Sequence, residues 1–192
     1  MPMKRLQYNS PVILTFALIS LISLGLGSVT KGYSTTLLFC TYRSSLLDPL
    51  TYVRAIGHVF GHANWLHFSG NMTYILLLGP MLEEKYRSRN MIEMIAITAV
   101  VTAIANALFA PHTALLGASG IVYMMIILAS QANLQEGRIP LTMIFAFVVY
   151  IGAELTNGFV LNDNVAHFAH VIGGVCGGSF GYILLKDKKS QE

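Results

Sequence analysis

Three groups of polar residues have the types and spacing that acyl transfer requires, and each lies in otherwise apolar sequence. The first is Gly117-Ala118-Ser119-Gly120, which would place Ser119 near the N-terminus of a helix with Tyr123 one turn farther on. Free backbone N–H groups and the positive end of the helix dipole favour negative charge there, which suits a serine nucleophile and a developing oxyanion. A lone serine among small residues is more commonly a packing residue. Ser119 therefore indicates a nucleophile only if a base and oxyanion donors can be identified elsewhere in the sequence.

The second group is a histidine on a helix face lined with glycine. His170 is followed by Gly173, Gly177 and Gly181, and offsets of 3, 7 and 11 residues return close to one direction of a helix. Such glycines let another helix approach closely. The imidazole would therefore be pressed against the helix that docks there, and the helix beginning at Ser119 is a candidate. The glycines alone indicate only a packing stripe.

The third group is a run of histidines that ends in an asparagine, namely His58, His62, His67 and Asn71. His67 and Asn71 are four residues apart, so on a helix they project from one face about one turn from each other. Each residue alone is explained by an interfacial position or by helix packing. With a serine and a histidine base, however, these donors complete the requirements for acyl transfer through a tetrahedral oxyanion.

The elements that must position these residues are helices that span a membrane. The 192 residues are 54% hydrophobic and 11% charged, with a mean hydropathy of +0.61, which excludes an ordinary soluble domain. A hydrocarbon layer about 30 Å thick needs roughly 20 apolar helical residues. Six stretches qualify: 11–29, 66–82, 91–110, 115–134, 139–156 and 165–185. We expect one all-α domain over residues 1–192, a six-helix bundle with a longer outer segment between the first two spans.

Basic residues fall mostly on one side of the expected bundle. Nine lysines and arginines lie on the side of both termini, whereas only Lys31, Arg43 and Arg54 lie on the other. Because positive charges are retained in the cytoplasm, we expect a multi-pass membrane protein with both termini cytoplasmic. The net charge of +3 belongs to these flanks and gives no evidence of nucleic-acid binding. The first stretch could alternatively be a signal peptide, although it is long for one and lacks a good cleavage site.

The ordered combination of motifs resembles the rhomboid family of intramembrane serine proteases, over nearly the whole chain in a minimal six-helix form. The motif residues that match the family are His58, His62, His67 and Asn71; Gly117, Ser119, Gly120 and Tyr123; and Ala169, His170 and Gly173. The resemblance implies a rhomboid bundle whose first outer loop is associated with the membrane. It also implies transmembrane protein substrates and no metal or cofactor. A six-span chain of this minimal form fits a protein of a bacterial plasma membrane.

The resemblance also implies a role for each matched residue. Ser119 would attack the scissile carbonyl, and His170 would act as its base in a dyad that needs no Asp. The oxyanion hole would consist of the Ser119 backbone N–H and the side chains of His67 and Asn71, while Tyr123 would pack against His170. Further positions are supporting: His58, His62 and Asn64 as lining of a water-filled cavity, Arg54 in the outer loop, Glu83 as a structural carboxylate, and Gly117, Gly120 and Gly173.

The sequence departs from the family at two positions and leaves other functions open. Val53 replaces a usual Trp, and Arg87 stands where Gly is common. One alternative is a rhomboid-like protein that binds transmembrane helices without cutting them. Another is a metal-binding or transport protein, since His58 and His62 have i, i+4 spacing, although no Cys or carboxylate clusters with them. The substrate, the gating helix, the oligomeric state and the roles of His167, Glu154 and Asp163 are left open.

Overall fold

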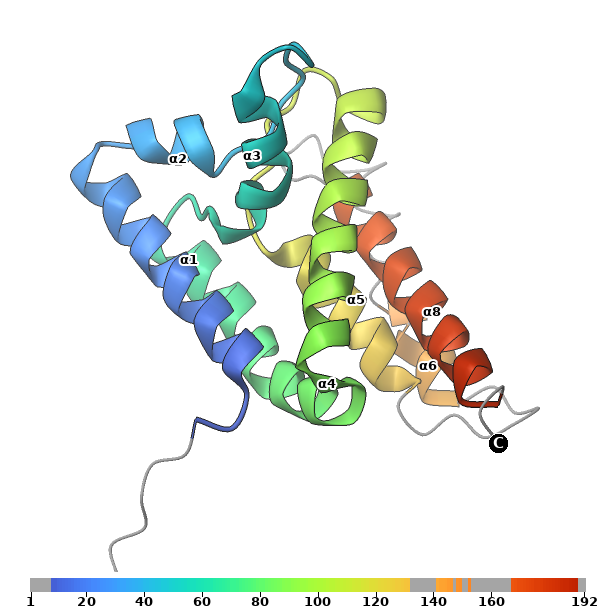
Figure 1. The fold of residues 1–192 in the computed structure, drawn as a ribbon. Helices are drawn as coiled ribbons and strands as arrows, with labels where there is room; N and C mark the ends of the chain where they lie inside the picture. Colours follow the sequence, from blue (N-terminus) through green and yellow to red (C-terminus); the bar gives the residue numbers. More distant parts are fainter. Residues whose placement is uncertain (1–7, 132–140, 147, 150–151, 153–166, 190–192) are drawn as a thin grey trace, which may run out of the picture.

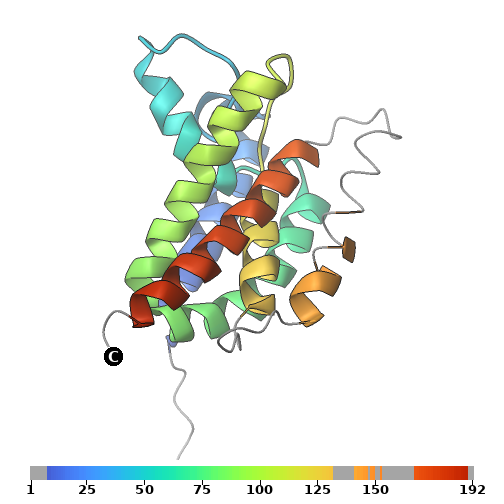
Figure 2. The ribbon, with the colours of Figure 1, turned by 90° about the vertical axis from the view of Figure 1, so that its right-hand side faces the viewer.

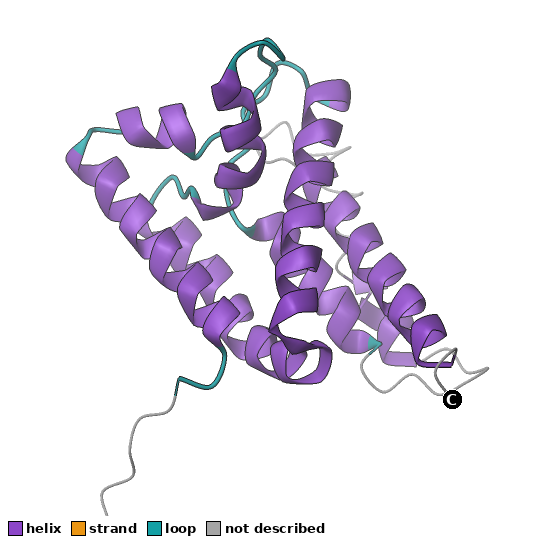
Figure 3. Ribbon diagram, in the orientation of Figure 1, coloured by secondary structure: helices purple, strands orange, loops and turns teal. Residues whose placement is uncertain are grey.

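The structure is a computed structural model that describes residues 8–131, 141–146, 148–149, 152 and 167–189. Helices dominate this part of the chain, with loops at their ends (Figure 3). In order they are α1 (Pro11–Val29), α2 (Tyr33–Leu38), α3 (Pro49–Gly57), the 3₁₀ turn η1 (His58–Phe60), α4 (Trp65–Phe109), α5 (Ser119–Ser130), α6 (Leu141–Ala146) and α8 (His167–Lys189).

The helices follow the apolar stretches of the sequence. α1 has the bounds expected for the first stretch, α4 contains the second and third, and α8 begins two residues inside the sixth. α1 and α4 are each long and apolar enough to cross a membrane by length and composition. The fifth stretch, 139–156, lies largely outside the described residues, and only α6 and a few further residues represent it.

The fourth stretch begins later than its hydropathy suggests. We expected helix from residue 115, whereas α5 starts at Ser119. The reason is local, because Leu115 pairs with Thr41 through two backbone hydrogen bonds of 2.8 Å, and Gly117 has a φ of +117°. Both conformations are incompatible with a helix. The apolar residues before Ser119 therefore form an extended lead-in to α5.

α4 consists of two helical arms that meet at Arg87. This residue has φ 70° and ψ 153°, which interrupts the helix. Figure 1 shows α4 folding back on itself near its label. The carboxylate of Glu83, which is 4% exposed, accepts hydrogen bonds from the N–H groups of Val12 and Ile13 and from the hydroxyl of Ser88. Because the first N–H groups of a helix lack partners within it, Glu83 caps α1 from the neighbouring helix.

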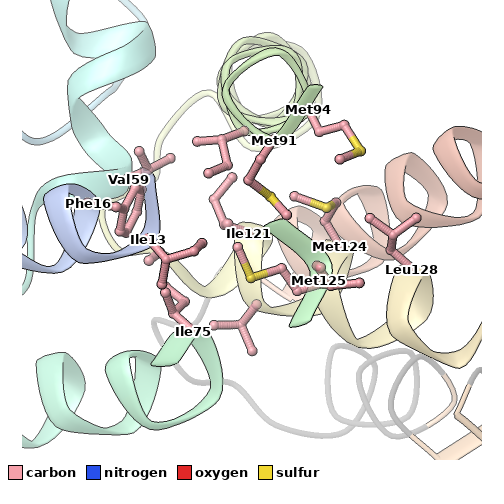
Figure 4. Packing of buried hydrophobic residues seen from close by; sticks show 14 of the residues in the cluster. Ile13, Phe16, Val59, Ile75, Met91, Met94, Ile121, Met124, Met125 and Leu128 are labelled. Carbon is pink, nitrogen blue, oxygen red and sulfur yellow. The ribbon is translucent and has the colours of Figure 1, made fainter. Parts of the chain in front are cut away.

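The core lies where α1, both arms of α4 and α5 meet. Its members include Ile13 and Phe16 of α1, Ile75 and Met91 of α4, and Met124 of α5 (Figure 4). α5 is the central element, and residues 120–122 and 124–128 along it are buried. It packs against both α4 and α8; Figure 1 shows it behind the second arm of α4, and Figure 2 shows it beside α8. A short helix surrounded in this way is held by its neighbours, which makes α5 a rigid platform for whatever lies at its N-terminus.

The conformation of Arg87 predicts a stabilising substitution. Its φ/ψ region is essentially restricted to glycine and costs other residues about 1–3 kcal/mol, so Arg87→Gly should raise the free energy of unfolding by roughly 1 kcal/mol after the added chain entropy of glycine. A thermal-unfolding assay in detergent measures this. The control is Arg89→Gly, which lies two residues on in regular helix and should lower stability by a similar amount. Equal effects of the two substitutions would contradict the assignment of strain to Arg87.

Candidate active site

Ser119 is the first residue of α5, and the loop before it fixes its position. The preceding Ala118 makes no side-chain cap, so the first N–H groups of α5 have no capping side chain. The N–H of Gly117 donates to the carbonyl oxygen of His58 at 2.9 Å. This bond and the pairing of Leu115 with Thr41 attach the loop to the segment before α4. The serine is therefore held both by its own helix and by the segment between α1 and α4.

Close packing of α8 on α5 brings a histidine to this serine. A Cβ on Gly173 would collide with the carbonyl oxygen of Gly120, and one on Gly177 would collide with that of Met124. Only glycine permits so close an approach of two helix backbones. At the start of this contact, His170 Nε2 lies 2.8 Å from Ser119 Oγ. With Nε2 unprotonated, the serine hydroxyl donates to it.

An aromatic ring and a second histidine surround His170. The Tyr123 ring stacks on the imidazole with a centroid separation of 4.7 Å and an interplanar angle of 5°. The ring of His167 meets the same imidazole edge-on at 6.3 Å. His170 itself is only 9% exposed. Its ring plane is therefore set by packing, with Nε2 directed at Ser119.

The first arm of α4 presents His67 and Asn71 to the loop before Ser119. A Cβ built on Gly117 would lie 2.6 Å from His67 Nε2 and 3.6 Å from Asn71 Nδ2, so both side chains border the backbone just before the serine. Asn64 caps α4 by accepting a 2.9 Å hydrogen bond from the N–H of His67, which fixes this turn. Asn71 is 8% exposed, and its Nδ2 has no hydrogen-bond partner among the described residues.

His58 and His62 lie in the segment between the first two predicted spans, and they occupy different surroundings. His62 and Asn64 line a cavity of about 660 Å³ between the end of α1, α2 and the start of α4, whereas His58 is buried with its Nε2 3.4 Å from Thr102 Oγ1. The rings of His62 and His67 meet edge-on at 5.1 Å. Burial lowers the pKa of both His58 and His62 to about 4, so both are neutral near pH 7.

Arg54 is buried within the segment between α1 and α4. It is 5% exposed, and it bonds the carbonyl oxygen of Leu37 and forms a 3.1 Å ion pair with Asp48. Its guanidinium also stacks on Tyr42. Because Asp48 caps α3 by accepting from the N–H of Leu50, this cluster orients the helix that leads directly into His58.

Sequence reasoning missed a buried polar face on the second arm of α4. Thr98, Thr102 and Asn106 are each at most 4% exposed, and a Cβ on Gly120 would lie 3.3 Å from the Thr102 methyl group. Their four-residue spacing within an apolar stretch was the available signal. No comparable spacing in the sequence indicated the ion pair of Asp48 with Arg54. Glu154 and Asp163 lie outside the described residues.

Comparisons with known proteins agree with the motifs. A family model described as Rhomboid domain matches residues 49–187. Rhomboid-related protein 1 of Caenorhabditis elegans is 30% identical over 142 residues, which are 69% of this chain and 40% of that protein. Rhomboid-related protein 2 of Mus musculus is 28% identical over 159 residues, 72% of this chain and 53% of that protein. The chain thus spans about half the length of these relatives. Both are animal proteins, so they lend no support to the bacterial origin that the sequence suggested.

The contact of Gly173 with Gly120 predicts opposite effects of one substitution at two glycines of α8. Gly173→Ala would place a methyl group against a backbone carbonyl and force the helices apart, which should lower stability by about 1–3 kcal/mol. Gly178→Ala meets only a side-chain methyl of Ile127 at 3.9 Å, so it should leave stability unchanged or raise it. Thermal unfolding of both variants in detergent decides the matter. Similar losses of stability in the two variants would show that the contact of Gly173 with Gly120 does not limit how closely α8 packs on α5.

Proposed function

The chain belongs to the rhomboid family, and on that premise we propose that it is an integral-membrane serine endopeptidase that cleaves transmembrane segments of other proteins. The observation that carries the proposal is the 2.8 Å approach of Ser119 Oγ and His170 Nε2, residues that are 51 positions apart in sequence. A nucleophile within hydrogen-bond reach of its base is the geometric requirement for acyl transfer. Family membership supplies the membrane setting and membrane-protein substrates.

The proposed reaction begins with transfer of the Ser119 proton to His170 Nε2. Ser119 Oγ then attacks the scissile carbonyl carbon, and His170 returns the proton to the leaving amine, which departs and leaves an acyl-enzyme. Water, deprotonated by the same imidazole, next attacks the ester and regenerates the serine. The stacked ring of Tyr123 holds the imidazole plane in place during both steps.

The oxyanion hole is the second part of the proposal. The backbone N–H of Ser119 at the start of α5, with the side chains of His67 and Asn71, would donate to the negatively charged oxygen of the tetrahedral intermediate. The Nδ2 of Asn71 has no partner in the part of the chain that the structure describes, and it lies beside Gly117; both observations support this role. The cavity lined by His62 and Asn64 is the proposed access for water from the end of the bundle that carries α2.

The substrate must expose a peptide bond that its own helix conceals. In hydrocarbon an unpaired peptide group is expensive, so a transmembrane helix keeps its bonds intact. We therefore propose that substrates carry glycine, proline or other helix-weakening residues near the end of the membrane at which Ser119 lies. We also propose that both termini are cytoplasmic, because most lysines and arginines lie on their side.

Substitution of either dyad residue should abolish cleavage. Liposome-reconstituted protein is incubated with a transmembrane reporter, and Ser119→Ala and His170→Ala should each reduce kcat by a factor on the order of 10³ or more. Ser179→Ala, in an exposed part of α8, is the control and should cut normally. Cleavage that survives either dyad substitution would refute the assignment. Capture of the reporter without cleavage by wild type would favour a non-catalytic binder of helices, and loss of activity on chelation would favour metal chemistry.

Removal of the proposed oxyanion donor should affect chemistry more than binding. Asn71→Ala should lower kcat by roughly 10²-fold to 10³-fold while leaving KM nearly unchanged, because the donor acts mainly in the transition state. Ser69→Ala, at a half-buried position in the same helix turn, is the matched control. An increase in KM with unchanged kcat would instead assign Asn71 to substrate binding. Thermal unfolding of Asn71→Ala separates either effect from misfolding.

A further inference from the structure

A second cleft, away from the dyad, lies between α3 with the loop before it and the second arm of α4. We call it the α3–α4 cleft, and its volume is about 680 Å³. Figure 1 shows α3 beside the upper end of α4. Arg43, Tyr42 and Thr51 line one side, whereas Ala103, Ala107 and Leu108 are among the residues of α4 that line the other. One wall is therefore polar and basic, and the other is apolar.

The polar wall carries a cation that the fold does not use. Arg43 is exposed, and it makes no hydrogen bond or ion pair within the part of the chain that the structure describes. Arg54 is the opposite case, since it is buried, paired with Asp48 and stacked on Tyr42. Within the described residues, the guanidinium of Arg43 therefore has no polar partner that would compete with an anion.

The apolar wall continues into surface that faces lipid. Ile104 and Leu108 of α4, which line the cleft, are 54% and 68% exposed. In a protein of a membrane family, such apolar faces are covered by acyl chains. A molecule in the cleft would therefore place its hydrocarbon along α4 and its charged group near the loop, which is the amphiphilic pattern of a phospholipid.

We propose that the α3–α4 cleft binds an anionic phospholipid, with the phosphate at Arg43 and one acyl chain against Ala103, Ala107 and Leu108. The acyl chain gains little by leaving the bilayer, because lipid tails are as apolar as the cleft. Preference for the anionic lipid must then come from the guanidinium, and a basic residue near the surface contributes about 1 kcal/mol. This corresponds to roughly a fivefold preference over a zwitterionic lipid.

A lipid in this cleft would brace the helix that leads to the proposed active site. α3 ends at Gly57, and His58 follows directly and lies 3.4 Å from Thr102. Thr102 is the neighbour of Ala103, which lines the cleft. The cleft and the contact of His58 with Thr102 therefore involve the same turn of α4.

Photolabelling tests the proposal without reference to protease activity. Photoactivatable phosphatidylglycerol, or photoactivatable phosphatidylcholine, is diluted into phosphatidylcholine vesicles that contain the Ser119→Ala protein, and labelled residues are mapped by mass spectrometry. We expect phosphatidylglycerol to label residues 41–46 and 100–108 preferentially. Arg43→Gln should lower its labelling relative to phosphatidylcholine by about fivefold. Lys31→Gln, which removes a cation from the neighbouring cavity, should not.

A second pair of variants tests the apolar wall. Ala107→Leu fills the cleft from a half-buried position and should reduce labelling by both lipids, whereas Val101→Leu on the exposed face of α4 outside the cleft should change neither. Equal labelling by the two lipids, or equal effects of Arg43→Gln and Lys31→Gln, would overturn the proposal. Displacement by soluble glycerol phosphate would overturn it as well, because it would assign the site to a free anion.

Discussion

The site depends above all on the backbone contact between α8 and α5. Between helices in a bilayer there is little hydrophobic driving force, so close van der Waals packing has to hold them together. Gly173 lies against the Gly120 carbonyl and Gly177 against that of Met124, which sets both the separation and the register of the helices. Since Ser119 precedes Gly120 and His170 lies one turn before Gly173, the same contact sets their 2.8 Å separation.

The opposite side of the serine is held by a segment that hydropathy alone would describe as a connecting loop. The carbonyl of His58 accepts from Gly117 N–H, and Thr41 pairs with Leu115. Asp48 and Arg54 in turn orient the helix before His58. The segment between α1 and α4 is thus part of the framework around Ser119. A displacement of α3 would therefore be transmitted to Ser119 through His58 and its hydrogen bond with Gly117.

Much of this arrangement could be predicted from sequence, and the remainder has a physical explanation. Hydropathy located α1 and α8, and helical periodicity placed His170 on the glycine face that meets α5, because both properties are local. The start of α5 was predicted four residues too early, since an apolar extended strand and an apolar helix have similar hydropathy. The contact of His58 with Thr102 joins residues 44 positions apart. No spacing rule relates such residues, so only the folded chain identifies them as neighbours.

Two buried asparagines of α4 differ in whether their side-chain amides have hydrogen-bond partners among the described residues. Asn106 is 4% exposed and its Nδ2 donates to the Thr113 carbonyl at 3.0 Å, so its amide closes the loop after α4 and is satisfied in the resting protein. Asn71 is 8% exposed, yet its Nδ2 has no partner among the described residues. Such an unpaired donor costs about 1–3 kcal/mol, and an apolar residue would pack there without that cost. The role proposed for Asn71, as a donor that finds its acceptor when an oxyanion forms beside Ser119, would account for this difference.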